Sequence, residues 1–203
     1  MLESLKLKPV KIMKSAWYMI LVRHWNTKLN SDGKLRAFID VPLDDTGFKQ
    51  AHDVGNKLKG RKIDMIFTSD FIRAQQTADV ISKITWAPIM WKTFSLRPWN
   101  LGKYAGKDIK ESLPVLAEYA EHKPDEKIPD WESFNTFKKR FFTFIHALKL
   151  KYPWKNIVIV AHHRNDRMMH GWEKKWMNDD FDIDIETFLQ KGIEPWTHRV
   201  IWK

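Results

Sequence analysis

The sequence contains no cysteine, and this absence removes several kinds of chemistry. A chain without cysteine forms no disulfide bond, uses no thiolate nucleophile and binds no zinc through sulfur. The chain also lacks an apolar run of the roughly 18–20 residues that a membrane-spanning helix requires. Residues 1–14 scatter lysine among apolar residues and are not followed by the apolar stretch and cleavage site of a secretion signal. We therefore expect a cytoplasmic protein that does not engage a membrane.

The chain also has no internal repeat, no low-complexity linker and no shift in composition along its 203 residues. With 43% hydrophobic residues, it is long enough to bury one sizeable core. These features predict a single domain over residues 1–203. Within this domain we expect residues 1–14 to form an N-terminal extension and residues 85–130 to form a cap or specificity segment.

What the chain does have is an excess of positive charge, with a formal net charge of +10. Basic proteins attract partners that carry phosphate, nucleic acid among them. Here the charge is spread along the chain, and runs such as Lys138–Arg140 are too short to predict a nucleic-acid surface. The same charge would steer a small anionic substrate, which is the partner we expect.

Short apolar runs and helical periodicity alternate along the chain. Runs rich in aromatic and β-branched residues predict strands at residues 16–22, 63–68 and 157–161, and a final strand at 198–202. Amphipathic spacing predicts helices at residues 46–58, 71–84 and 134–151. Because continuously apolar strands alternate with helices, we expect a three-layer α/β/α sandwich around a mostly parallel central sheet.

Arginine and histidine follow the predicted strands at the points where ligands bind in such sheets. Arg23 and His24 follow the first strand, Arg73 comes shortly after the second, and His162 and His163 follow the third. Together these side chains would form a strongly positive cup. Arginine suits bidentate contact with phosphate oxygens, and a neutral imidazole can attack phosphorus.

Five segments that contain these residues resemble the motifs of the histidine phosphatase superfamily, which includes the cofactor-dependent phosphoglycerate mutases. Arg23–Thr27 resembles the signature Arg-His-Gly-x-Thr, and Asp40–Ala51 resembles the segment D-x-P-L-T-x-x-G-x-x-Q-A. Thr68–Ala78 resembles the segment S-S-D-L-x-R-A-x-Q-T-A, and Leu96–Gly106 resembles the segment L-x-E-x-x-x-G-x-x-x-G. Val160–His162 resembles the segment V-S-H-G. The segments occur in the family's order and cover residues 16–165. We identify the chain as similar to the phosphatase branch of this superfamily.

The resemblance implies a phosphoglycerate mutase-like fold and a role for each matching residue. His24 would be the nucleophile that becomes phosphohistidine. Arg23 and Arg73 would bind the phosphoryl oxygens, and His162 would donate a hydrogen bond to the same group.

Asn30 and Thr27 fall at supporting positions of the same motif. Asn30 matches a position near the phosphate, and Thr27 is expected to hold the loop or to support His24. The family's chemistry requires no metal or other cofactor, and no spacing of ligands in the sequence indicates a metal site.

Two departures from the family pattern affect these expectations. Trp25 stands where the signature has glycine, so its indole either narrows the pocket or covers the core. Pro98 stands where the family has the glutamate that protonates the leaving oxygen. We expect Asp108 and Glu111 to lie at the exposed start of a helix rather than in the site.

A third departure is His163, which stands where the motif has glycine. An imidazolium can donate a proton near neutral pH, so His163 is a candidate for the missing acid. The alternative is that His163 caps the strand end or only shapes the pocket. Arg164 and Arg167 follow it, and either contact a second phosphate or carboxylate or face solvent.

These observations predict a hydrolase that removes a phosphoryl group from a small phosphorylated metabolite or nucleotide. Turnover is expected to suffer from the missing glutamate. A module that binds a phosphorylated ligand without turning it over is the alternative. A mutase fits less well, because the segment 85–130 is short for one. The sequence leaves the oligomeric state open, a homodimer included.

Overall fold

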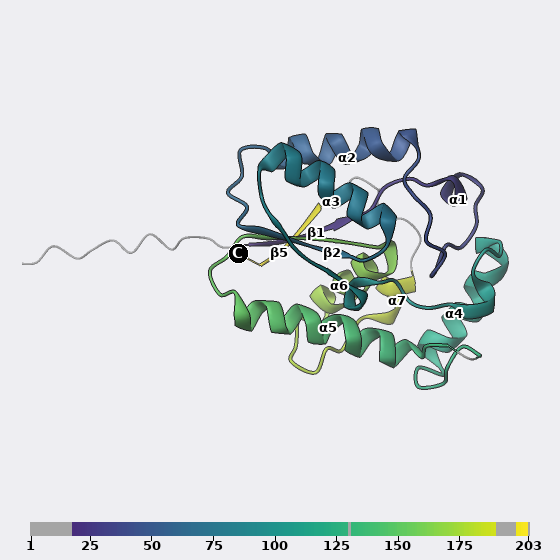
Figure 1. Cartoon of the computed structure of the whole chain (residues 1–203). Coiled ribbons are helices and arrows are strands. Elements are labelled where there is room, and N and C mark those ends of the chain that lie inside the picture. The colour runs from purple at the N-terminus through teal and green to yellow at the C-terminus, as the bar shows by residue number, and fades with distance from the viewer. Residues whose placement is uncertain (1–17, 130, 190–197, 203) are drawn as a thin grey trace, which may run out of the picture.

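The computed structural model describes residues 18–129, 131–189 and 198–202. The expected N-terminal extension and the first two residues of the first predicted strand lie outside these ranges. The described chain forms three layers, with α2 and α3 on one face of a central sheet and α5, α6 and α7 on the other (Figure 1). The three-layer α/β/α architecture expected from the sequence is confirmed.

The sheet has five strands in the order β3-β2-β4-β1-β5. The strands are β1 (Met19–Arg23), β2 (Met65–Ser69), β3 (Ile89–Thr93), β4 (Ile157–Ala161) and β5 (His198–Trp202). Neighbouring strands from β3 to β1 pair in parallel, whereas β5 pairs antiparallel to β1. The four strands expected from the sequence are present, and β3 is an additional edge strand.

Helices connect and cover these strands. They are α1 (Lys28–Ser31), α2 (Asp45–Leu58), α3 (Ile72–Thr85), α4 (Ile109–Glu121), α5 (Phe134–Lys151), α6 (His163–Lys174) and α7 (Ile185–Leu189), with 3₁₀ turns η1 (Phe94–Leu96) and η2 (Gly102–Tyr104). Helix α2 starts one residue earlier than its expected Thr46, because the Asp44 carboxylate accepts a hydrogen bond from the Gly47 backbone N–H at 2.7 Å and caps the helix.

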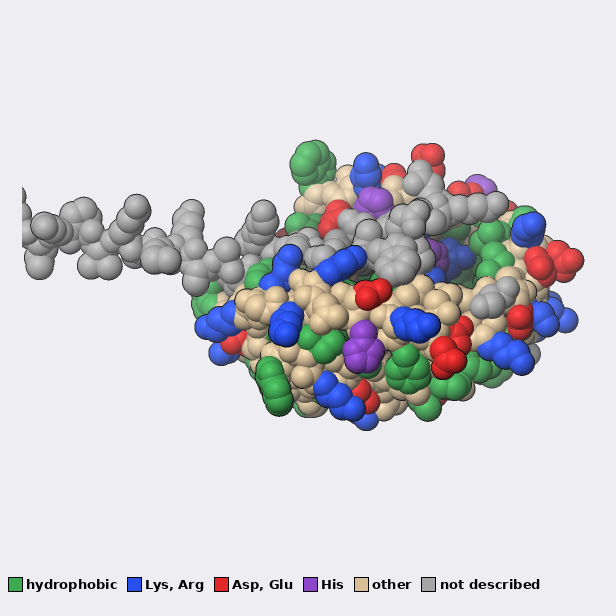
Figure 2. All heavy atoms as spheres, turned by 90° about the horizontal axis from the view of Figure 1, so that it is seen from above, with side chains coloured by type: hydrophobic (Ala, Val, Ile, Leu, Met, Phe, Trp, Pro, Cys, Tyr) green, Lys and Arg blue, Asp and Glu red, His purple; other side chains and the backbone are tan. Residues whose placement is uncertain are grey.

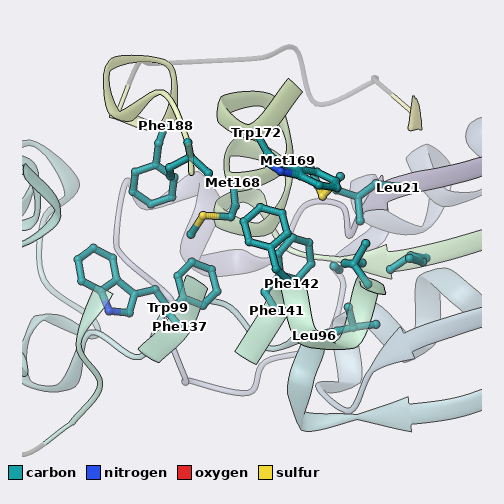
Figure 3. Packing of buried hydrophobic residues seen from close by; sticks show 14 of the residues in the cluster. Leu21, Leu96, Trp99, Phe137, Phe141, Phe142, Met168, Met169, Trp172 and Phe188 are labelled. Carbon is teal, nitrogen blue, oxygen red and sulfur yellow. The ribbon is translucent and has the colours of Figure 1, made fainter. Parts of the chain in front are cut away.

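The two faces of the sheet pack against different cores, because alternate residues of a strand point to opposite faces. From β1, Ile20 and Val22 pack with the residues of α2 and α3. Met19 and Leu21 pack with the aromatic side chains of α5 and with α6. Figure 3 shows this second core, in which Phe142 lies beside Trp172. Both faces are therefore covered, as the continuously apolar strand sequences require.

The parallel pairing brings the carboxyl ends of β1, β2 and β4 to one edge of the sheet. There the His24 backbone N–H donates to the Ala161 carbonyl at 2.9 Å, which continues the β1–β4 pairing into the loop. Lys and Arg side chains are scattered between acidic ones over the face shown in Figure 2. Within the described residues, no helix has the length and apolar character needed to cross a membrane.

Candidate active site

Three strand ends deliver the predicted residues to one place. His24 follows β1, Arg73 lies in the first turn of α3 after β2, and His162 follows β4. The rings of His24 and His162 are 5.0 Å apart between centroids, and Arg73 Nε donates to His24 Nε2 at 3.3 Å. All three side chains are at least 98% buried, so their charges act in a medium that screens them poorly.

These residues line a cavity of about 250 Å³. Its polar lining is Arg23, His24, Asn30, Lys34, Arg36, Arg73, His162, His163 and Arg164, and its apolar lining is Leu35, Ala37, Pro98, Trp99, Leu101, Ile109, Leu113 and Leu189. Of the residues predicted for the site, only Thr27 is absent from this lining. None of the described lining residues carries a carboxylate.

The backbone fixes the tautomer of His24. Its Nδ1 lies 2.7 Å from the carbonyl oxygen of Trp25, which can only accept a hydrogen bond, so Nδ1 carries the proton. Burial lowers the pKa of His24 well below its ordinary value, and the nearby Arg36 and Arg73 lower it further. The ring is therefore neutral near pH 7, and its Nε2 lone pair accepts the 3.3 Å hydrogen bond from Arg73 Nε. That contact must give way before Nε2 can attack phosphorus.

Arg73 is held rigidly beside that lone pair. Its Nη1 donates to the Ile39 carbonyl at 2.8 Å and its Nη2 to the Ala37 carbonyl at 3.2 Å. Burial lowers its pKa to about 10, and Asp40, 3.7 Å away, opposes the shift. The guanidinium stays protonated at neutral pH, so it presents a fixed positive charge at the position where a phosphoryl group would bind.

His162 offers one ring nitrogen to a ligand. Its Nε2 is 2.8 Å from the Ser69 hydroxyl, while Nδ1 is buried without a hydrogen-bond partner among the described residues. When Ser69 donates to Nε2, the proton of the ring resides on Nδ1. Burial, followed by the charges of Arg73 and Arg36, lowers the pKa of His162 well below its ordinary value. A neutral His162 can thus donate a hydrogen bond to a bound oxygen.

His163 lines the cavity, and its ring also contacts Arg23. Arg23 Nη1 donates to His163 Nδ1 at 3.1 Å, because a guanidinium has no acceptor. Burial lowers the pKa of His163 well below its ordinary value, and Arg23 and Arg164 lower it further. This environment favours the neutral ring and the role of positioning Arg23 over that of a proton donor.

Asn30 and Thr27 support the loop between β1 and α1. The Asn30 side-chain oxygen accepts hydrogen bonds from the Thr27 backbone N–H and from the Thr27 hydroxyl, each at 3.0 Å. Thr27 is completely buried, whereas Asn30 reaches the cavity. Thr27 therefore holds the loop, and Asn30 links it to the site.

The residues that depart from the family motif lie partly in the cavity lining and partly outside it. Trp25 is 3% exposed and packs in the core beneath α2 and α3, outside the cavity lining. Pro98 lines the cavity. Asp108 caps α4 by accepting a hydrogen bond from the Lys110 backbone N–H at 2.7 Å, and neither Asp108 nor Glu111 lines the cavity, as expected.

Arg36 was not among the residues predicted for the site, and the place of Arg164 was open. Arg36 lies in the loop that the Arg73 side chain holds through the carbonyls of Ala37 and Ile39. The only sequence signal was its nearness to the Asp40 motif, which did not separate it from other scattered basic residues. Among the described residues, no group of three His, Asp or Glu side chains could hold a metal ion.

The chain belongs to the histidine phosphatase superfamily, branch 1, whose sequence profile matches residues 19–183. It is 31% identical to the "Uncharacterized phosphatase PhoE" of Bacillus subtilis (strain 168) over 144 residues, which cover 70% of this chain and 69% of that protein. It is 26% identical to the "Metal-independent phosphoserine phosphatase" of Arabidopsis thaliana, with 91% of each chain covered.

Solved structures agree with this assignment at the level of the fold. The structure of Bacillus stearothermophilus YhfR superposes with a TM-score of 0.73 at 20% identity and covers 93% of this chain and 96% of that one. Membership of the family and the relatives named above make this protein a phosphatase.

Proposed function

We propose that this protein is a phosphomonoester hydrolase that works through a phosphohistidine on His24 and without a metal ion. The observation that supports it best is the pairing of a neutral His24, protonated on Nδ1, with the Arg73 guanidinium 3.3 Å from Nε2. The substrate is a small phosphorylated metabolite or nucleotide. The segment 85–130, which supplies five of the apolar lining residues, selects it.

In the first step, His24 Nε2 attacks phosphorus and forms an N–P bond as the P–O bond to the leaving group breaks. The electron pair of that bond stays on the leaving oxygen, which takes a proton from solvent. Arg23, Arg73 and His162 stabilise the negative charge on the oxygens of the transferring group. In the second step, water attacks the phosphohistidine, the N–P bond breaks, and its electron pair returns to Nε2. The proton released by the water leaves with solvent or phosphate.

The test is to quench the protein rapidly with alkali after mixing it with ³²P-labelled substrate, starting with p-nitrophenyl phosphate in the presence of EDTA. We expect acid-labile, alkali-stable label on the protein, and its loss in His24→Ala. His122→Asn is the matched control, because His122 is 67% exposed on its side chain and lies at the end of α4.

Phosphate release without any trapped label would contradict the covalent mechanism. Binding of vanadate without turnover of any phosphomonoester would favour the binding module instead. Inhibition by EDTA that added metal reverses would contradict metal independence.

A further inference from the structure

Among the described residues that line it, the cavity shows no acid placed to protonate a leaving oxygen. No carboxylate lies among its described lining residues. The acids near the site lie outside this lining. Asp40 is 3.7 Å from Arg73 and accepts a hydrogen bond from the Ile72 backbone N–H at 2.8 Å, and Asp70 forms two hydrogen bonds of 2.8 Å with Arg97. Glu132 pairs in the same bidentate way with Arg140, at 2.9 and 3.0 Å.

The histidines do not fill this gap. His24 is the nucleophile, and His162 and His163 are held neutral by burial and by the arginines around them. Lys34 is exposed at the rim of the cavity. A general acid commonly contributes about 10²–10⁴-fold when the leaving oxygen is poor. A site built in this way suits a leaving group that departs without a proton.

The cavity also contains more positive charge than one phosphoryl group uses. Arg36 and Arg164 line it in addition to Arg23 and Arg73. Arg36 Nη1 is buried and has no hydrogen-bond partner among the described residues. A buried N–H group without an acceptor is costly, so this atom is suited to donate to an oxygen of a bound anion. The surplus charge suits a leaving group that is itself anionic.

We propose that the site cleaves phosphoanhydrides, namely diphosphate monoesters of the form R–O–PO₂–O–PO₃, and that Arg36 and Arg164 bind the departing phosphate. This proposal rests on the function proposed above. His24 Nε2 attacks the terminal phosphorus, the anhydride P–O bond breaks, and the electron pair leaves on R–O–PO₃. A phosphate monoester has a second pKa of about 6. It therefore departs as a dianion at neutral pH and needs no general acid. The group R contacts the apolar lining at Leu101, Ile109 and Leu113.

The first experiment compares kcat/KM for three substrates with the wild-type protein: p-nitrophenyl phosphate, ADP and glycerol 2-phosphate. We expect ADP to exceed glycerol 2-phosphate by about 10²-fold or more, since the missing acid penalises only the alkyl ester. Equal rates for ADP and glycerol 2-phosphate would overturn this inference. The proposed function would still stand in that case if p-nitrophenyl phosphate were hydrolysed and the phosphohistidine were trapped. Failure of all three substrates would instead contradict the proposed function.

A second experiment restores the acid. Pro98 lines the cavity, so Pro98→Glu places a carboxyl group there, and Pro98→Gln is the matched control without a proton to transfer. We expect Pro98→Glu to raise glycerol 2-phosphate hydrolysis about tenfold or more over Pro98→Gln and to leave their ADP rates within a few-fold of each other. Identical behaviour of the two variants on the alkyl ester, with both folded by circular dichroism, would contradict the account.

A third experiment tests the anion contact. Arg36→Gln should lower kcat/KM for ADP about tenfold more than for p-nitrophenyl phosphate, whose leaving group carries only one developing charge. Arg61→Gln, at an exposed arginine outside the cavity, is the control. An equal loss on both substrates would show that Arg36 serves only the transferred phosphoryl group.

Discussion

Two parts of the cavity lining differ in origin and in chemistry. The histidine wall consists of Arg23, His24, Arg73 and His162, which stand at the ends of parallel strands or in the turn that follows one. The connection wall consists of residues 98–113 that line the cavity, and it is apolar. The sheet fixes the first wall, whereas the second is built on turns and the start of α4. In the proposed function, the strand ends would carry the phosphoryl chemistry, and the connection would select the substrate.

The largest expected effect comes from breaking the histidine wall at Arg73. Arg73→Met removes the guanidinium beside Nε2 and should lower kcat/KM about 10²–10³-fold, the usual cost of losing one donor to the transferring group. Steady-state assays with p-nitrophenyl phosphate measure this. Asp40→Asn is the control, because Asp40 is 43% exposed on its side chain and its contact with Arg73 is 3.7 Å long, and it should cost little. Comparable losses in the two variants would contradict this assignment.

Arg140 supports the segment that leads into the connection wall, and its substitution should remove this support. Its guanidinium pairs with Glu132 and donates to the backbone carbonyls of Phe94, Ser95, Arg97 and Pro98, at 3.0–3.2 Å. Arg140→Leu leaves the Glu132 carboxylate buried without its partner and should lower the free energy of unfolding by about 3–5 kcal/mol. Urea denaturation measures it.

The double variant Arg140→Leu/Glu132→Leu separates the charge from the contacts. Because no unpaired carboxylate remains, it should recover part of the lost stability. If the double variant is less stable than the single one, Glu132 stabilises this region through contacts other than the ion pair.

The pH dependence of stability should come from the histidine wall and its neighbour His163. The pKa values of His24, His162 and His163 are lowered in the folded state, so below about pH 6.5 the unfolded chain binds more protons. Stability is therefore complete above that pH and falls as pH decreases, by at most about 1.4 kcal/mol per pH unit for each histidine.

Urea denaturation at pH 7.5 and 5.5 measures this loss. His163→Gln removes one of the three groups, and the difference between the two pH values should shrink. An unchanged difference would mean that His163 titrates normally in the folded protein.

The smallest expected effect is at Thr27, which touches the loop of the histidine wall but not the cavity. Thr27→Val removes the hydroxyl contact with Asn30 and keeps the backbone one. We expect a loss of about 1 kcal/mol in unfolding free energy and a rate reduced about fivefold or less. Urea denaturation of the variant and the wild-type protein measures the change in unfolding free energy, and p-nitrophenyl phosphate assays measure the change in rate. A loss comparable to that of Arg73→Met would place Thr27 in the chemistry itself.

Elements with a clear apolar pattern could be predicted from the sequence, and strand β3 could not. The run Ile157–Ala161 is apolar throughout and gave β4 with the correct bounds. In β3, by contrast, Met90 and Trp91 are 41% and 44% exposed, because it is an edge strand, so no clear pattern marks it. The start of helix α4 at Asp108 and Glu111 was expected, but its length was not, because Pro114 argues locally against a continuing helix.

The part of the candidate site that lies next to the strands could be predicted from the sequence. His24, Arg73 and His162 follow from their positions after apolar runs and from the motif order. Arg36 could not be predicted, because its place depends on how Arg73 holds the loop around it through two carbonyls. The role of His163 likewise depends on which neighbour its ring contacts, and no local pattern shows that.

The acceptor that sets the tautomer of His24 is the backbone carbonyl of Trp25. Every amino acid supplies that carbonyl, so no single substitution at position 25 can delete it. The tautomer of His24, the proposed nucleophile, is therefore insensitive to which side chain stands at position 25. The side chain at position 25 can therefore serve the core, where Trp25 is 3% exposed, while its carbonyl holds the imidazole tautomer.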